Sequence, residues 1–389
     1  MYAGEIRDWP RRVRFGAGSV LCLPELIDDL GARRAVVVCG RSVAGGQMLE
    51  RVQQALGAHY AGVFAGVRSH TPYEDVSAAA DTARTLDADV IVSVGGGSAI
   101  DAGKGVVLFS ATGGDFAPYA IDYAAKGMAR QPLGAPSIRH IAVPTTAGSA
   151  SDVMPTAGIR DPKLPRKMLF WDQRLVPDAT ILDPQMAVHA GPELTAATGM
   201  TAVARAIESL YSKHRHPVSM GLALHAARLM RVALPVSVAD PRDLVARADC
   251  QFACLMSGTA SINAMASLVH AIGHVVGGRY GLQHGISHAI LLGPALRRLL
   301  PAIGPDFRYV LEALGCAPTA SASAAADAAA AAINDLLRRL PLPQRMREVG
   351  MQQADIAEVA RGTMGDYMMA NLPAPLALGD VEALLREAW

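Results

Sequence analysis

The first half of the chain alternates short apolar runs with stretches that have helical spacing. Each apolar run is rich in valine, isoleucine or alanine and is bounded by glycine, proline or charged residues. Strands that alternate with helices predict a parallel sheet with helices on both faces. The predicted strands are 35–39, 89–94, 141–143 and 179–182.

Two helices are predicted between these strands. Thr71 is expected to be the N-cap of the first, with Pro72 at its first position and Glu74 three residues after the cap. This helix should extend to about Leu86. The second is expected from Ser98 to about Phe109.

From Pro192 onward the pattern has helical periodicity and no clear strand. The alanine-rich stretch 320–340 is interpreted as one surface helix. The expected architecture is therefore an α/β domain with a parallel sheet over 1–185 and an all-helical domain over 186–389, with the active site in the cleft between them. Five prolines are expected to separate helices: Pro217, Pro235, Pro241, Pro294 and Pro301.

Length and composition fit a globular protein with two domains. The chain has 389 residues, of which 51% are hydrophobic and 18% charged, and its net charge is +1. A nucleic-acid-binding protein would normally carry a basic excess. No uninterrupted apolar run reaches membrane-spanning length, the first residues lack the apolar core of a signal peptide, and the five cysteines form no disulfide framework. We therefore expect a cytoplasmic protein that acts on a small molecule, without nucleic-acid or membrane partners.

A triple glycine follows the predicted strand at 89–94. Backbone N–H groups at a helix start bind phosphate, and glycine allows a pyrophosphate to approach closely. Ser98 could both cap the helix and donate to phosphate. Asp101 and Lys104 are three residues apart on that helix, so they could form a local ion pair. We favour Asp101 near a nicotinamide and a structural role for Lys104. An ordinary tight turn is the alternative for the whole motif.

A second small-residue turn follows the predicted strand at 141–143. Thr145, Thr146 and Ser149 supply hydroxyl donors with little bulk. A simple Ser/Thr turn explains this segment equally well. The functional interpretation therefore depends on whether the two turns lie together.

Histidines concentrate in the second half. His270 and His274 are four residues apart and share a helix face, which Asn263 and Ser267 are expected to extend, and His284 follows closely. Such a polar stripe on an apolar helix must face a polar cavity or leave polar groups unsatisfied. Metal ligation and hydrogen-bonded core histidines both remain open.

Several motifs in order resemble the iron-containing alcohol dehydrogenase family, most closely its maleylacetate reductases. The resemblance implies an iron-alcohol-dehydrogenase (dehydroquinate synthase-like) fold, hydride transfer with NAD(P)H and, usually, a homodimer. The motifs are GGGSAIDAGK (95–104), PTTAGSASD (144–152), RK (166–167), ILDP (181–184), ATGMTAVARAIESLY (197–211) and LVHAIGHVVGGRYGLQHGISHAILL (268–292).

The resemblance also implies where the coenzyme binds. NAD-using members commonly carry Asp at the strand end that binds adenosine ribose, whereas this chain has Gly40 followed by Arg41, which favours NADPH. The residues expected to hold the pyrophosphate and nicotinamide ribose are Gly96, Gly97, Ser98, Asp101, Thr145, Thr146, Ser149 and Lys167.

The metal site of these relatives is expected to be lost. Its four ligands match His270, His284, Thr201 and Arg205, and a guanidinium stays protonated and does not coordinate metal. We therefore predict no catalytic metal, with Arg205 stabilising the developing alkoxide or binding a substrate carboxylate. His274 is the candidate proton donor. A salt bridge from Arg205 to Glu208 is the structural alternative.

The favoured function is a metal-independent NAD(P)H-dependent reductase of maleylacetate or a similar small oxo-acid. One alternative is a diverged family member of a biosynthetic pathway that acts on another carbonyl compound. The other is a nucleotide-binding or lyase-type protein that has lost dehydrogenase activity. The candidate catalytic residues are Arg205, His270, His274 and His284.

Overall fold

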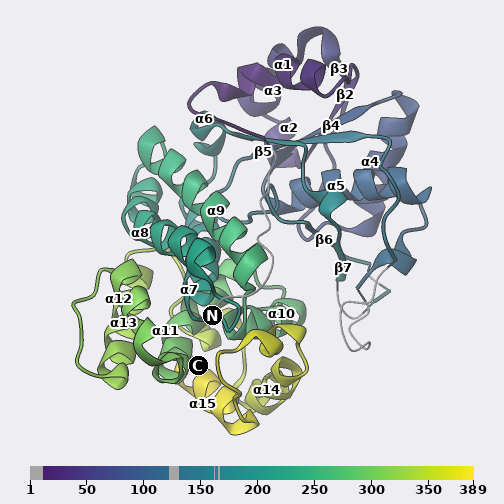
Figure 1. Ribbon diagram of the computed structural model, residues 1–389. Helices are drawn as coiled ribbons and strands as arrows, with labels where there is room; N and C mark the ends of the chain where they lie inside the picture. The colour runs from purple at the N-terminus through teal and green to yellow at the C-terminus, as the bar shows by residue number, and fades with distance from the viewer. Residues whose placement is uncertain (1–11, 122–130, 162, 165–166) are drawn as a thin grey trace. The chain divides into compact units, whose positions relative to one another are not determined.

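The computed structural model describes residues 12–121, 131–161, 163–164 and 167–389 (Figure 1). The chain divides into two compact units, with the break between His189 and Ala190. We call the first the sheet unit and the second, Ala190–Trp389, the helical unit. All strands of the described residues belong to the sheet unit.

A six-stranded parallel sheet forms the centre of the sheet unit, in the order β1-β8-β5-β4-β2-β3. The four predicted strands are confirmed as β2, β4, β5 and β8. The short β1 and the half-buried β3 were not predicted, because neither has a run of buried β-branched residues. The strands are β1 (Val13–Phe15), β2 (Ala35–Cys39), β3 (Tyr60–Phe64), β4 (Val90–Gly95), β5 (Arg139–Pro144), β8 (Ala179–Leu182) and an antiparallel pair, β6 (Thr156–Ile159) and β7 (Met168–Trp171).

Helices cover both faces of this sheet, as Figure 1 shows. Val37 of β2 belongs to the core that packs against α1 (Leu23–Asp29) and α3 (Gln47–Leu56). Val36 belongs to the opposite core, under α4 (Tyr73–Thr85) and α5 (Gly97–Thr112). Successive residues of a strand point to opposite faces, so a buried parallel strand is apolar throughout. Among the described residues, the remaining α-helices of the sheet unit are two short ones, α2 (Arg41–Ala44) and α6 (Pro184–Ala187).

The predicted start of α4 is wrong by one position. Pro72 is the N-cap and Tyr73 the first helical residue, and no side chain of the described residues caps the helix. Thr71 instead has a φ of 54°, and its Oγ1 donates to the carbonyl of Ser98 at 3.2 Å. The threonine therefore connects the loop to the start of α5.

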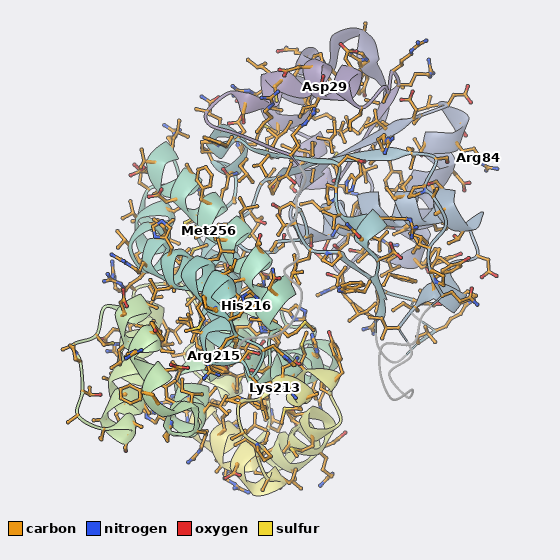
Figure 2. All side chains as sticks on the ribbon, viewed as in Figure 1. Asp29, Arg84, Lys213, Arg215, His216 and Met256 are labelled. Carbon is orange, nitrogen blue, oxygen red and sulfur yellow. The ribbon has the colours of Figure 1, made fainter. Side chains whose placement is uncertain are left out.

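The helical unit contains only helices among its described residues, as predicted. Figure 2 labels Lys213, Arg215 and His216 in the turn between its first two helices, where the His216 side chain accepts from the Ser219 N–H. The helices are α7 (Pro192–Tyr211), α8 (Pro217–Ala239), α9 (Leu244–Ala264), α10 (Leu268–Tyr280), α11 (His284–Leu299), α12 (Phe307–Leu314), α13 (Ala322–Arg338), α14 (Ile356–Met364) and α15 (Leu378–Ala388).

Two of the five prolines do not separate helices. Pro235 lies inside α8 and Pro294 inside α11, so that part of the prediction is wrong. Both are buried in the core of the unit, where tertiary packing outweighs the local cost of an interior proline. The alanine-rich stretch does form one helix, α13, which buries one apolar face against the rest of the unit.

One described helix, α8, is long and apolar enough to cross a membrane by length and composition. The pair α9 and α10 meets the same criterion only if the two are taken as one span bent by 105°. One or two such helices are weak evidence for a membrane span, because buried core helices have the same composition.

Candidate functional site

The two small-residue turns of the sheet unit lie against each other. Strands β4 and β5 pair so that Gly95 stands opposite Pro144, and the Thr145 N–H donates to the Gly95 carbonyl at 3.0 Å. A Cβ placed on Gly97 would lie 2.9 Å from the Cβ of Ser149. Any side chain there would fill the space between the turns, so the glycine keeps a cradle open at the start of α5.

Ser98 does not cap α5, contrary to one predicted role. The N-cap is Gly96, which has no side chain to offer. The Oγ of Ser98 accepts instead from the His70 N–H at 3.1 Å. No side chain in the described part of the chain therefore caps the N–H groups at the helix start.

Polar side chains of the sheet unit gather around this cradle. Thr146 is 6% exposed, and its Oγ1 has no hydrogen-bond partner among the described residues. Asp101 accepts from the Gly158 N–H at 3.1 Å. Burial raises the pKa of Asp101, against the opposing charges of Lys104 and Lys167. Orphaned buried polar atoms are uncommon in native proteins, so the Thr146 hydroxyl points to a polar ligand.

The two lysines near Asp101 have different surroundings. Lys104 is fully buried, and its Nζ donates to the carbonyls of Met154 and Thr156 at 2.6 and 2.8 Å. Burial lowers the pKa of Lys104 to about 8. These bonds agree with the structural role predicted for Lys104. Lys167 is partly exposed and faces Asp101, and its neighbour Arg166 lies outside the described residues.

A cavity of about 600 Å³ opens beside the end of β2. Gly40 precedes it as the N-cap of α2, and a Cβ there would lie 3.0 Å from the Val67 carbonyl oxygen. Arg41 was predicted at this position, whereas Arg68, which comes from the loop after the unpredicted β3, was not. The cavity is lined by Arg41, Val67, Arg68, Ser69 and Pro72.

In the helical unit, the buried α7 carries Thr201 and Arg205. Thr201 donates to the Ala197 carbonyl at 3.3 Å. A Cβ on Gly285 would lie 1.5 Å from that carbonyl oxygen, so α11 begins directly against α7. Arg205 is 4% exposed, and its Nη1 lies 3.5 Å from Ser257 Oγ.

The structure brings together the three predicted histidines and a fourth, His288. The ring centroids of His270 and His288 lie 4.2 Å apart, those of His284 and His288 5.6 Å, and those of His274 and His284 5.8 Å. We call these four residues the histidine cluster. His288 is completely buried, and burial, followed by the charges of its histidine neighbours and Arg205, holds its pKa well below the ordinary value. It is therefore neutral at physiological pH.

The predicted polar stripe is not continuous. Asn263 belongs to α9, which ends at Ala264, and Met265 has a φ of 64°. The axis turns by 105° before α10 begins, so Asn263 and His270 lie on different helices. Ser267, in the connection, donates through both its N–H and its hydroxyl to Glu208 at 3.2 Å.

Glu208 is the partner of His270. It is completely buried, and its carboxylate binds Nδ1 of His270 and accepts from the Val269 N–H at 2.8 Å. Burial acts to raise the pKa of Glu208, but the charge and hydrogen bonds of His270 and its neighbours outweigh this effect and lower it. Donors from α10 and from the connection before it therefore hold both carboxylate oxygens of Glu208.

The second acid at the cluster is Asp366. Its Oδ2 lies 2.9 Å from Nδ1 of His274, which lies 92 residues earlier in the chain. Neither Asp366 nor the contact of Glu208 with His270 was predicted from the sequence. No local pattern marks either contact, because each pairs residues from separate helices or loops.

The side chains present do not fit a divalent cation. The resemblance assigns Thr201 and Arg205 to the two ligand positions on α7, and a guanidinium there would repel a cation. Within the described ranges, no three His, Cys, Asp or Glu side chains are arranged to hold a metal ion.

Comparisons with known proteins agree with this architecture. The chain matches the models "iron-containing alcohol dehydrogenase" over residues 10–184 and "Fe-containing alcohol dehydrogenase family, C-terminal" over 195–389. It is 34% identical to maleylacetate reductase 2 of Cupriavidus pinatubonensis over 68% of this chain and 66% of that protein. It is 31% identical to 1,3-propanediol dehydrogenase of Klebsiella pneumoniae over 96% of both. A solved structure of a 1,3-propanediol oxidoreductase superposes with a TM-score of 0.90, at 30% identity and 98% coverage of both chains.

Members of this family are NAD(P)-dependent oxidoreductases that act on small molecules. The resemblance drawn from the sequence motifs is thereby confirmed at the level of family and fold. We conclude that the chain belongs to the iron-containing alcohol dehydrogenase family.

Proposed function

We propose that this protein is a metal-independent NAD(P)H-dependent reductase of maleylacetate or a similar small oxo-acid. The observation that carries the proposal is the buried guanidinium of Arg205, 4% exposed, beside the histidine cluster. A guanidinium is a permanent cation, and its charge acts more strongly where burial excludes water. A guanidinium matches the geometry of a carboxylate and stabilises a developing alkoxide. The 34% identity to maleylacetate reductase 2 supports the same substrate class.

The sheet unit carries the residues that would hold the coenzyme. Gly96 and Gly97 leave room for a pyrophosphate at the uncapped start of α5, and Thr146 offers an unpartnered hydroxyl. When bound, NAD(P)H supplies the hydride for carbonyl reduction. Asp101 and Lys167 would contact the nicotinamide ribose, with Ser98, Thr145 and Ser149 completing the path.

The cavity beside β2 supports NADPH as the preferred coenzyme. Gly40 leaves no acidic side chain at the strand end, and Arg41 lines the cavity together with Arg68. Arg68 forms an ion pair with Asp75 at 2.7 Å, which neutralises part of its charge. Arg41 is therefore the residue that we assign to the 2′-phosphate.

The helical unit carries the groups that would act on the substrate. Arg205 binds the carbonyl oxygen or the carboxylate, and His274 returns a proton to the alkoxide. His288 is unsuited to that step because it is neutral at physiological pH. His270 and His284 would border the substrate without a metal between them.

The direct test follows oxidation of NADPH and NADH in the presence of a panel of carbonyl compounds that includes maleylacetate. The protein is first treated with a chelator. Reduction of maleylacetate or another oxo-acid by the treated protein supports the proposal. Reduction of uncharged aldehydes alone would reject the oxo-acid substrate class. Reduction that occurs only after metal is added back would reject the metal-free mechanism.

A further inference from the structure

His274 is held from two sides by consecutive residues of a distant segment. Asp366 Oδ2 lies 2.9 Å from Nδ1 of its ring, and the ring of Tyr367 stacks on it with centroids 5.9 Å apart and planes inclined by 19°. Asp366 and Tyr367 lie in the connection between α14 and α15. The rotation of the imidazole about its side-chain bonds is therefore restricted by a hydrogen bond and by packing.

The carboxylate of Asp366 is itself fixed. Its other oxygen, Oδ1, accepts from the Met368 N–H at 2.9 Å as the cap of a short 3₁₀ helix, Tyr367–Asn371. One oxygen therefore holds the backbone and the other holds the histidine. The side chain of Asp366 is 13% exposed and that of His274 is 27% exposed.

This arrangement selects one tautomer of His274. A carboxylate is only an acceptor, so Nδ1 must carry the proton that it receives. The other ring nitrogen, Nε2, is then free to exchange a proton with a ligand. Which nitrogen of a histidine is protonated depends on the hydrogen bond made by the other.

The geometry points to Asp366 as a positioning residue that holds His274 with Nδ1 protonated, so that Nε2 faces the reacting oxygen. This inference rests on the proposed function. As the carbonyl carbon takes the hydride pair from the coenzyme, the oxygen takes the Nε2 proton of the imidazolium. The ring is left neutral, with its remaining proton on Nδ1 against Asp366. Because the ring is partly exposed, water can return the proton to Nε2.

The decisive variant is Asp366→Asn. The Met368 N–H needs an acceptor, so the asparagine oxygen takes the Oδ1 position and its NH₂ group faces Nδ1 of His274. Nδ1 must then accept, and the proton moves to Nε2. Nitrogen-15 NMR of histidine-labelled protein, with the His274 signals assigned by loss in His274→Gln, reports this change without any substrate.

The kinetic readouts follow from the same change. We expect kcat for the carbonyl substrate to fall by roughly 10²-fold, the lower end of the range for general acid catalysis, while KM changes little. The solvent deuterium isotope effect on kcat should increase, because proton transfer becomes slower. Asp366→Glu, which keeps the carboxylate, should restore part of the rate.

Two further variants separate positioning from folding. Asp366→Ser keeps a hydroxyl that can cap the 3₁₀ helix but does not reach His274, so it should stay folded and lose the rate. Asp355→Asn is the matched control, because Asp355 binds Arg279 and Tyr280 and not the histidine cluster. It should leave kcat and the His274 tautomer unchanged.

The outcomes are distinct for this inference and for the proposed function. A wild-type His274 whose neutral ring carries its single proton on Nε2, or an Asp366→Asn variant with unchanged tautomer and kcat, would overturn the positioning role. A tautomer switch in a protein that reduces no carbonyl compound would support the positioning role and overturn the proposed reductase.

Discussion

Glu208 binds Nδ1 of His270 from a position 62 residues earlier in the chain, inside the fully buried part of α7. The same carboxylate accepts from two N–H groups at the start of α10, those of Ser267 and Val269. The carboxylate therefore stabilises the first turn of α10 and also fixes His270, the first histidine of the cluster.

Glu208→Gln should destabilise the helical unit. The amide keeps the shape but loses the charge that Nδ1 of His270 and the two N–H groups bind, and removing one partner of a buried pair costs about 3–5 kcal/mol. Chemical denaturation followed by circular dichroism measures the change. Glu382→Gln, which removes an exposed i, i+4 pair with Arg386, should change stability by less than about 1 kcal/mol. Equal effects of the two variants would contradict this account of Glu208.

Gly285→Ala should be strongly destabilising. The new Cβ would lie 1.5 Å from the Ala197 carbonyl oxygen, so α11 would have to move away from α7. Overpacking a core costs about 1–3 kcal/mol. The clash here is with a backbone carbonyl, which can move away from the new Cβ less easily than a side chain can. Gly278→Ala is the control, because no atom of the described residues lies within 4 Å of its Cβ position in α10. A melting temperature for Gly285→Ala as high as that of the control would show that the two helices are not in this close contact.

Lys104 should make stability depend on pH above neutrality. Its pKa is about 8 in the folded protein and about 10.4 in an unfolded chain. Between these values the unfolded state binds more protons, so the contribution of Lys104 to the free energy of unfolding rises with pH. The melting temperature of the wild type should therefore rise relative to that of Lys104→Met between about pH 8 and 10. A constant difference across that range would show that the buried amine keeps its ordinary pKa.

NADPH should bind at least as tightly as NADH, and Arg41→Ala should weaken NADPH more than NADH. The physical reason is the loss of a cation beside the 2′-phosphate, in a cavity where Gly40 adds no acidic group. Calorimetric titration of both coenzymes gives the ratio. Arg84→Ala is the control, because Arg84 is an exposed residue at the end of α4 (Figure 2) that pairs with Asp81. A wild-type preference for NADH of more than about tenfold, or 1.4 kcal/mol, would contradict the assignment.

The sequence predicted the elements whose local pattern is strong. Buried β-branched runs identified β2, β4, β5 and β8, and the spacing of His270 and His274 placed both on one face of α10. The break at Met265 was missed because a residue other than glycine rarely adopts a positive φ. Tertiary packing, which no local pattern encodes, determines the break.

Asp366 and Arg68 were also beyond sequence reasoning. Asp366 lies 92 residues from His274, and Arg68 comes from a loop whose preceding strand was not predicted. Each becomes recognisable only when the fold brings separate elements together. The glycine turns were easier to find, because their conformational requirement and their chemistry lie in one short segment.

The central claim is that the charge of Arg205 replaces that of a metal, and the direct measurement is kcat/KM for maleylacetate reduction by chelator-treated wild type, Arg205→Ala and Arg205→Lys. Wild type should be active without stoichiometric iron or zinc. Arg205→Ala should lose roughly 10²–10³ in kcat/KM, the scale for one preorganised donor, and lysine should restore part of it. Arg215→Ala, which removes a partly buried arginine bound to Asp306, controls for lost stability. One bound metal per active wild-type chain, or wild-type kinetics in folded Arg205→Ala, would contradict the claim.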